Sequence, residues 1–252
     1  MLNKWEDIPD FMKNDSVKLY YNLLNKKRFE LFIKRIFDII LAIFTMIILS
    51  PLLILISFVI LFDSKGPIMY CQVRVTQYGK NFKIYKFRTM INNADQIGTQ
   101  VTTKNDYRVT RTGRILRKSK LDEIPQLINI ILGEMSFVGT RPEVPKYVEN
   151  YTDEMYATLL LPAGITSEAS IQYKDEERLL DSTENVDQKY IQVILPEKMR
   201  YNLKSIENFR FFRDIKTIIK TLIAMIYRRK TSKKSIEDLS TDKNEVKIKW
   251  KI

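Results

Sequence analysis

The sequence predicts one α+β domain that is mostly helical, carries a small β-hairpin or sheet, and is seated on a membrane. Three observations predict this: a long apolar run interrupted by proline, two β-prone stretches around a glycine turn, and helical patterns through the remainder. At 252 residues the chain can bury a substantial core. We expect a basic or amphipathic segment at 1–33, a membrane helix at 34–62, a cytoplasmic domain at 63–230 and a mobile charged tail at 231–252.

The membrane segment is residues 36–62, IFDIILAIFTMIILSPLLILISFVILF. It exceeds the roughly 18 apolar residues that indicate a membrane helix, and a soluble core helix of this length would normally show a polar face. Pro51, after Ser50, lies near its middle and bends the helix. Both flanks are basic, and the positive-inside rule keeps both on one side. We therefore expect a re-entrant helix, with an ordinary kinked span as the alternative.

A carboxylate, Asp38, lies just inside this apolar run. Burying it there is costly unless it is paired, and Lys34 and Arg35 precede it by one helical turn. We expect an interface anchor rather than a contact to a lipid phosphate.

The stretches 68–75 and 81–87 predict a β-hairpin that turns at Gln77-Tyr78-Gly79-Lys80. It carries the cations Arg74, Lys83, Lys86 and Arg88. A solvated basic face and a face that binds phosphate are equally consistent with the sequence.

The most informative stretch is residues 121–143, LDEIPQLINIILGEMSFVGTRPE, which opens with Asp122 and Glu123 after a basic run. A helix is expected over 124–132, with Pro125 in its first turn. The two acids then lie near a helix N-terminus, where backbone N–H groups lower carboxylate pKa values. Taken alone, an acidic pair at this place is explained by helix capping.

Near the C-terminus, residues 209–227 form a basic amphipathic pattern with one apolar helical face. Such a helix lies on an anionic membrane surface or packs against its own domain, and the sequence does not decide between them.

Composition narrows the chemistry. The formal charge of +12 indicates an anionic partner, and the single cysteine, Cys71, fits a reducing compartment. The chain contains no histidine, so neutral-pH base chemistry must use other groups. Carboxylates, lysines, arginines and a hard oxygen-bound ion remain.

Several motifs in order make the chain resemble a known family, the bacterial sugar transferases, also called monotopic phosphoglycosyl transferases. The motifs are KRIFD, the mid-helix Ser50-Pro51, GPIMYCQVR, KFRTM and LRKSKLDEIPQLINIILGEMSFVGTRPE. They cover roughly residues 34–143, with weaker matching to about 226.

The resemblance implies a re-entrant helix and transfer of a sugar-1-phosphate from a UDP-sugar to a polyprenyl (undecaprenyl) phosphate, releasing UMP. This is the first membrane step of capsule, exopolysaccharide or O-antigen type biosynthesis. It implies a covalent phosphosugar on the aspartate, Mg²⁺ at the glutamate, and a bacterial cytoplasmic membrane location with the catalytic domain facing the cytoplasm. Nucleic acid is not an expected partner, and homo-oligomerisation stays open.

Carried over by position, Asp122 is the expected nucleophile and Glu123 the metal-binding acid. We call Asp122 and Glu123 the dyad. The expected substrate-binding residues are Lys86, Arg88, Arg117 and Arg141. They are expected to contact phosphates, to support the dyad or to lie on the nucleotide side. The chain departs from the common pattern at Thr76, at Thr140 and in LPAGITSEAS, and the last two put the sugar's identity in doubt.

Two rival functions come from other classes. A basic, membrane-anchored adaptor without enzymatic activity would need the charge but not the ordered acidic pair and arginine motifs. A membrane-bound nucleic-acid binder would show aromatic side chains for base stacking among its cations, and this pattern is missing from the sequence.

Overall fold

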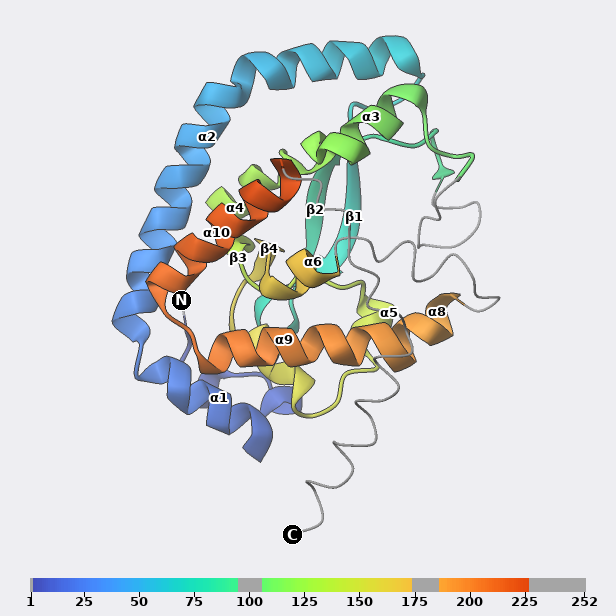
Figure 1. Ribbon diagram of the computed structural model, residues 1–252. Helices are drawn as coiled ribbons and strands as arrows, with labels where there is room; N and C mark the ends of the chain where they lie inside the picture. Colours follow the sequence, from blue (N-terminus) through green and yellow to red (C-terminus); the bar gives the residue numbers. More distant parts are fainter. Residues whose placement is uncertain (1, 95–105, 174–185, 227–252) are drawn as a thin grey trace.

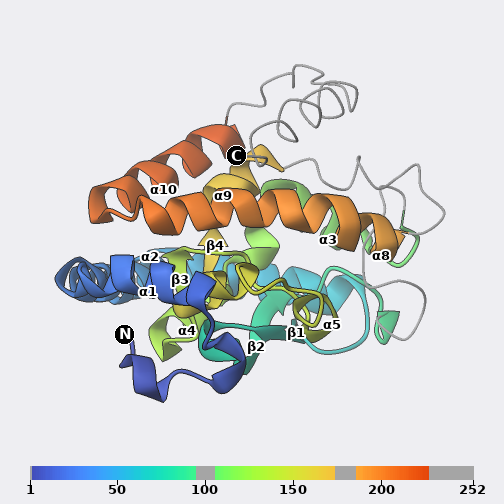
Figure 2. The ribbon, with the colours of Figure 1, turned by 90° about the horizontal axis from the view of Figure 1, so that it is seen from below.

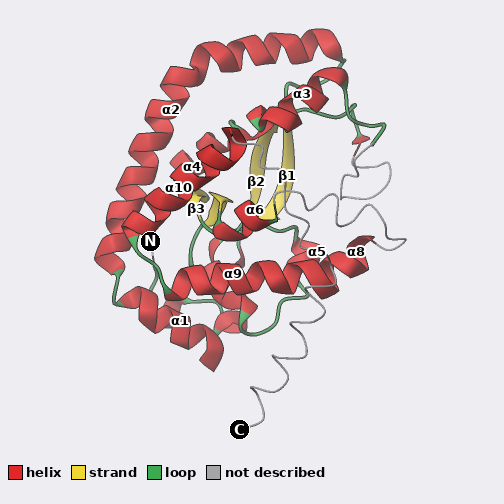
Figure 3. Ribbon diagram, viewed as in Figure 1, coloured by secondary structure: helices red, strands yellow, loops and turns green. Residues whose placement is uncertain are grey.

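The computed structural model describes residues 2–94, 106–173 and 186–226, so the predicted tail at 231–252 lies outside the described residues. Helices surround two small sheets (Figure 3), which confirms the mostly helical α+β class. The α-helices are α1 Asp15–Asn25, α2 Arg28–Asp63, α3 Arg111–Ser119, α4 Gln126–Leu132, α5 Pro145–Val148, α6 Glu168–Gln172, α8 Val186–Lys189, α9 Leu195–Glu207 and α10 Phe211–Ile226. The strands are β1 Met69–Val75, β2 Asn81–Phe87, β3 Met135–Val138 and β4 Ala163–Thr166.

The predicted hairpin is confirmed. Strands β1 and β2 pair antiparallel, with Met69 opposite Phe87 and Val75 opposite Asn81. Phe82 and Ile84 turn inward and pack against Ala42 of α2 and against α4. The hairpin is thereby fixed between the long helix and the short helix that follows the acidic pair.

A second, parallel pair joins β3 to β4, with Met135 opposite Ala163 and Val138 opposite Thr166. The backbones approach so closely that a Cβ on Gly164 would lie 2.1 Å from the Gly139 nitrogen. Glycine is therefore required at 164. The Gly164 N–H also donates to the Thr140 carbonyl at 2.8 Å, which fixes the start of the loop that carries Arg141.

Helix α2 bends between its two halves and follows the edge of the body (Figure 1), with Pro51 inside it. It is long and apolar enough to cross a membrane. The first half packs through Ala42 onto the hairpin and α4, and the second half through Ile56 and Ile60 onto Phe87 and α3. Both halves therefore contact the same body.

The base of α2 is tied down by charged side chains. Asp38 is buried, accepts a hydrogen bond from Ser136 Oγ at 2.7 Å and lies 3.8 Å from Lys34 Nζ. Arg35 donates instead to the carbonyls of Ile130 and Ile131 at the end of α4. Asp38 thus fixes α2 to β3 inside the protein, which differs from the interface anchor that we expected, because the body covers this end of the helix.

Helices α9 and α10 lie on the same side of the molecule (Figure 2) and diverge from the turn that joins them (Figure 1). The polar side of α10 faces inward: Asp214 binds Lys34, with 2.5 Å between carboxylate and ammonium, and Thr221 Oγ1 lies 2.7 Å from Thr166 Oγ1. Its apolar side chains face outward, namely Phe212, Ile219, Leu222 and Ile223. The helix therefore packs against its own domain through polar groups and leaves its apolar face uncovered by the described chain. Packing against the domain and lying on a membrane surface, the two alternatives from the sequence, are thus compatible.

The N-terminal residues belong to the main body. Met12, Val17, Tyr20, Tyr21 and Leu24 are buried in the largest core cluster together with residues of α9. Helix α2 begins at Arg28, so the boundary expected between 33 and 34 falls inside a continuous helix.

Candidate active site

The acidic pair lies in a single 3₁₀ turn, Leu121–Glu123, between α3 and α4. Lys120 takes a left-handed conformation (φ 58°) that ends α3 and redirects the chain. Pro125 then precedes α4, where its missing N–H costs no hydrogen bond. The local sequence thereby places Asp122 and Glu123 beside the end of β2.

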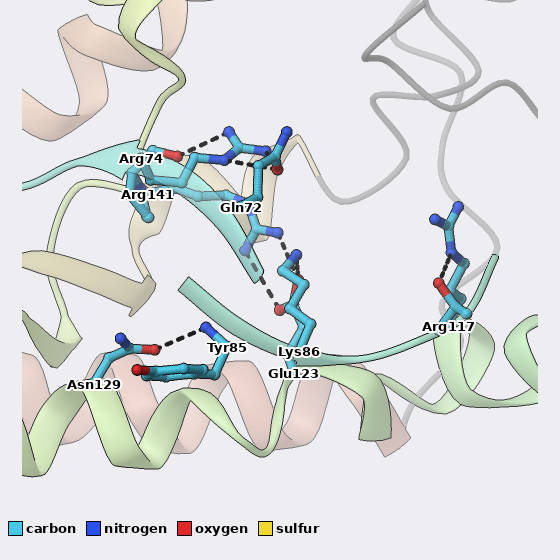
Figure 4. Close-up of polar contacts among 10 residues, drawn as sticks. Gln72, Arg74, Tyr85, Lys86, Arg117, Glu123, Asn129 and Arg141 are labelled. Carbon is cyan, nitrogen blue, oxygen red and sulfur yellow. Dashed lines mark hydrogen bonds and ion pairs between the residues drawn. The ribbon is translucent and has the colours of Figure 1, made fainter. Parts of the chain in front are cut away.

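Glu123 is held by two cations. Lys86 Nζ of β2 lies 3.0 Å from its Oε1, and Arg141 Nη2 lies 2.6 Å from the same oxygen. Figure 4 shows both side chains converging on the carboxylate from different segments. Burial alone would raise the pKa of Glu123, but Arg141 and Lys86 outweigh it and hold that pKa well below its ordinary value. Glu123 is therefore a fixed anion.

Asp122 has the opposite electrostatics. Its side chain is buried, and its Oδ1 has no hydrogen-bond partner among the described residues. Burial raises its pKa, Glu123 raises it further, and Lys86, Lys120 and Arg117 pull it down. The expectation that a helix N-terminus lowers the pKa of this carboxyl is therefore wrong for Asp122, because desolvation outweighs the neighbouring positive charges.

The other two predicted arginines lie apart from Glu123. Arg117 donates from Nε to Thr89 Oγ1 at 2.8 Å (Figure 4) and acts on Asp122 through its charge. Arg88 is buried and donates from Nη2 to the Ser64 carbonyl at 2.5 Å, at the end of α2. Its Nε and Nη1 have no partners within the described chain. In the present geometry Arg88 contacts the C-terminal end of α2.

Gln72 was not named from the sequence, and Arg74 was named only as one of the hairpin cations. Gln72 accepts two hydrogen bonds from Arg74, and Arg74 also donates to the Pro142 carbonyl at 3.1 Å, next to Arg141. Gln72 pairs with Ile84 and Arg74 with Phe82, so both lie on the same face of the hairpin as those partners, and Lys86 of β2 shares that face. Strand register was the signal that could have identified them. The site thus contains Lys86 and Arg141 around Glu123, with Arg74 close by and within electrostatic reach of Glu143.

The donor set limits the kind of metal site. Within the residues described, no group of three or more His, Cys, Asp or Glu side chains gathers as a metal site. The oxygen donors near the cations are Asp122 and Glu123, and one oxygen of Asp122 is unpaired. Mg²⁺ commonly takes one or two carboxylates and completes its shell with water and substrate phosphate oxygens. The residues therefore fit a hard cation that arrives with a phosphorylated ligand, with Glu123 as its protein ligand.

Comparison with known proteins decides the family. A family model described as bacterial sugar transferase matches residues 29–228. The chain belongs to the bacterial sugar transferase family. The match includes the dyad, the hairpin, the Arg141 loop and nearly all of the described C-terminal helices.

Individual relatives of this sugar transferase agree with the assignment. The chain is 34% identical over 200 residues to a UDP-N-acetylgalactosamine-undecaprenyl-phosphate N-acetylgalactosaminephosphotransferase of Aeromonas hydrophila, covering 76% of this chain and 43% of that protein. It is 33% identical over 195 residues to the UDP-glucose:undecaprenyl-phosphate glucose-1-phosphate transferase of Escherichia coli K12, covering 75% of this chain and 39% of that protein.

A shorter relative is the putative undecaprenyl-phosphate N-acetylgalactosaminyl 1-phosphate transferase of Bacillus subtilis, 39% identical over 135 residues. That alignment covers 54% of this chain and 75% of the relative. The chain spans less than half the length of the Aeromonas and Escherichia relatives.

Proposed function

We propose that this protein transfers a sugar-1-phosphate from a UDP-sugar to undecaprenyl phosphate and releases UMP, as the first membrane step in building a polysaccharide or glycoconjugate. The observation that carries the proposal is the buried Asp122 with an unpaired carboxylate oxygen, placed beside a cation cluster around Glu123. The names of the relatives, which act on undecaprenyl phosphate, support the same reaction class.

The transfer proceeds in two displacements at one phosphorus. Asp122 attacks the phosphorus that bears the sugar, the bond from that phosphorus to the bridging oxygen breaks, and UMP leaves. A phosphate oxygen of the lipid then attacks the same phosphorus, and the carboxylate of Asp122 departs. Splitting the reaction lets the soluble nucleotide leave before the lipid arrives.

Charge makes attack by a carboxylate on a diphosphate feasible. Lys86 and Arg141 supply two positive groups against the single fixed charge of Glu123, so the excess screens the phosphates. Burial raises the pKa of Asp122, which makes it a more basic, and so stronger, nucleophile than an exposed carboxylate once it is ionised. Mg²⁺ at Glu123 would neutralise further phosphate charge.

The surroundings of the site suit a lipid acceptor. Helix α2 exposes apolar side chains along its length, and both of its halves contact the body that carries the dyad. A re-entrant helix, with the dyad on the cytoplasmic face of the membrane, would bring a lipid phosphate and a cytoplasmic nucleotide sugar to the same place.

The experiment incubates purified protein with Mg²⁺ and one of three donors: UDP-glucose, UDP-galactose or UDP-N-acetylgalactosamine. We expect one donor to leave a phosphosugar adduct, seen by intact mass, and to release UMP when undecaprenyl phosphate is added. Asp122→Asn should form no adduct and lose turnover by about four orders of magnitude or more.

The control is Asp153→Asn, which changes an exposed acid away from the dyad and should keep full activity. Near-normal UMP release from folded Asp122→Asn contradicts the nucleophile. Wild-type protein that is inactive with every UDP-sugar favours the adaptor.

A further inference from the structure

Gln126, in the first turn of α4, has no exposed surface, and neither its amide nitrogen nor its amide oxygen has a partner within the described residues. Buried amides are normally satisfied, because an unpaired polar group pays the full cost of leaving water. Asn129 on the same helix follows this rule: it accepts from the Tyr85 N–H and donates to the Lys83 carbonyl and Glu134. The unpaired amide of Gln126 therefore requires an explanation.

The position of Gln126 supplies one. It follows Asp122 by four residues, and the backbone between them is helical through Ile124 and Pro125. Residues at this spacing lie on the same side of a helical turn, within reach of one another. Asp122 Oδ1 is itself a buried acceptor without a partner. A donor without an acceptor and an acceptor without a donor thus occupy adjacent positions on one face.

We propose that Gln126 is a positioning residue for the dyad: its Nε2 donates a hydrogen bond to Asp122 Oδ1 when the UDP-sugar is bound. This inference rests on the proposed function. The bond holds one carboxylate oxygen so that the other, Oδ2, faces the phosphorus. The two atoms are not in hydrogen-bond contact in the present geometry, so a side-chain rotation within the turn brings them together.

The same donor serves both displacements. After the first, Oδ1 is the carbonyl oxygen of the acyl phosphate, and it still accepts the Gln126 N–H. During the second, that oxygen regains negative charge as the carboxylate departs, and the hydrogen bond strengthens. A neutral amide suits this task, since a lysine there would pair permanently with Asp122 and weaken it as a nucleophile.

The alternative is that Gln126 only fills space. The two roles predict opposite responses to Gln126→Met, which keeps the length of the side chain and removes its polar atoms. An amide without partners stabilises nothing in the free protein, so the methionine variant should melt at the same temperature as wild type or higher. A structural role predicts a lower melting temperature.

The test measures adduct formation by intact mass in a single turnover, with the UDP-sugar that labels wild-type protein. For Gln126→Met we expect the maximal rate to fall about ten- to a hundredfold, the effect of one hydrogen bond to a charged group, with an unchanged half-saturating concentration. The glutamate in Gln126→Glu offers no donor when ionised, so the maximal rate of this variant should fall at least as far. The control Leu127→Met alters a buried neighbour on α4 and should keep the wild-type rate.

Each outcome decides the matter. A wild-type maximal rate in Gln126→Met overturns the inference, as does a rate loss that comes with a lower melting temperature and an equal loss in Leu127→Met. If wild type is labelled and Gln126→Met is labelled equally fast, the proposed function stands and only this inference fails. If wild type is labelled by no UDP-sugar, the proposed function fails and takes the inference with it.

Discussion

At the scale of single residues, burial and cations act in opposite directions on two neighbouring carboxyls. Asp122 is desolvated and repelled by Glu123, whereas Glu123 is neutralised by Arg141 and Lys86. The pair therefore separates into a basic carboxylate and a permanent anion. This separation supports the proposal that Asp122 attacks and that Glu123 binds the cation.

The metal role of Glu123 can be tested directly. EDTA should stop adduct formation, and added Mg²⁺ should restore it, since the carboxylates near the cations are hard ligands. Glu123→Gln should lower activity and require a higher Mg²⁺ concentration for half-maximal rate, measured by UMP release. Full activity of wild type in chelator, or an unchanged Mg²⁺ requirement in the variant, would leave Glu123 only its two ion pairs with Lys86 and Arg141.

Of the site residues predicted from the sequence, some lie together in the structure and others lie apart. Lys86 and Arg141 converge on Glu123, as the motifs indicated. Arg88, two residues after Lys86, binds the end of α2 at Ser64. A motif gives the order of residues, but the packing of α2 against the hairpin determines that Arg88 contacts Ser64 and not Glu123.

At the scale of elements, the site depends on a close contact between β3 and β4. Gly139 and Gly164 touch through their backbones, and the contact positions Thr140 just before Arg141. Thr76 completes the junction: its hydroxyl donates to the Glu134 carbonyl at 2.6 Å and accepts from the Ala163 N–H at 3.1 Å. The departures at Thr76, Thr140 and LPAGITSEAS therefore all meet where the Arg141 loop is fixed.

Gly164→Ala tests this junction. A Cβ there would lie 2.1–2.5 Å from Gly139 backbone atoms, so the strands must separate and move the Arg141 loop. We expect a loss of about 1–3 kcal/mol in unfolding free energy and at least tenfold slower adduct formation. Ala169→Gly in α6 is the matched control, because it costs about 1 kcal/mol without touching the loop. Equal rates in the two variants would contradict the role of the junction.

A second element contact joins the Arg141 loop to the C-terminal helices. Glu143 is buried with Lys198 of α9 at 3.4 Å, and it accepts a hydrogen bond from Tyr190 at 2.6 Å. Burial alone would raise the pKa of Glu143, but Lys198 and Tyr190 hold that pKa below its ordinary value. The pair thus fixes the loop to α9 as a charged contact.

Lys198→Met should cost about 3–5 kcal/mol, because it leaves a buried carboxylate without its cation. The double variant Lys198→Met with Glu143→Gln should recover part of that loss, measured by denaturant unfolding in detergent. A single variant within about 1 kcal/mol of wild type would show that Tyr190 and Arg74 suffice for Glu143.

Periodicity identified the longer elements but not the pairing between β3 and β4. The hairpin, α4 and α10 follow alternation or helical spacing over many residues, and each was predicted within a few residues of its observed bounds. Strands β3 and β4 contain four residues each, too few to show a pattern, and their pairing joins distant parts of the chain. The inward polar side of α10 was also unpredictable, because its partners Lys34 and Thr166 come from other elements.

At the scale of the whole molecule, apolar side chains remain exposed on two neighbouring helices. Along α2 they include Ile40, Phe44, Ile47, Phe58 and Phe62, and on α10 Phe212 is 81% exposed. Helix α10 packs against α2 through the Lys34–Asp214 ion pair and the Phe37–Phe211 ring contact, so the exposed groups lie on two helices in contact. A surface of this kind is typical of a membrane or protein interaction site.

The arrangement of α2 makes a definite prediction of topology. Both halves of the helix pack on one body, and both flanks are basic, so residues before Lys34 and after Asp63 should face the same side of the membrane. Asn25 and Asn81 are exposed on either side of α2. Single cysteines at these positions, in a Cys71→Ser background, should both resist an impermeant thiol reagent in intact cells and react after permeabilisation. Labelling of the Asn25 position alone in intact cells would show a spanning helix.

Pro51→Leu then tests what sets this topology. The proline removes one backbone hydrogen bond near mid-helix, and replacing it should straighten α2. A straight helix cannot keep both the contacts of Ala42 with the hairpin and those of Ile56 and Ile60 with α3. We expect a fraction of Pro51→Leu molecules to label at the Asn25 position in intact cells, and adduct formation to fall in proportion. Ile54→Leu, an exposed apolar change in the same half, should label as wild type does. If Pro51→Leu keeps the wild-type labelling, the flanking charges and the packing of both halves hold the topology without the bend.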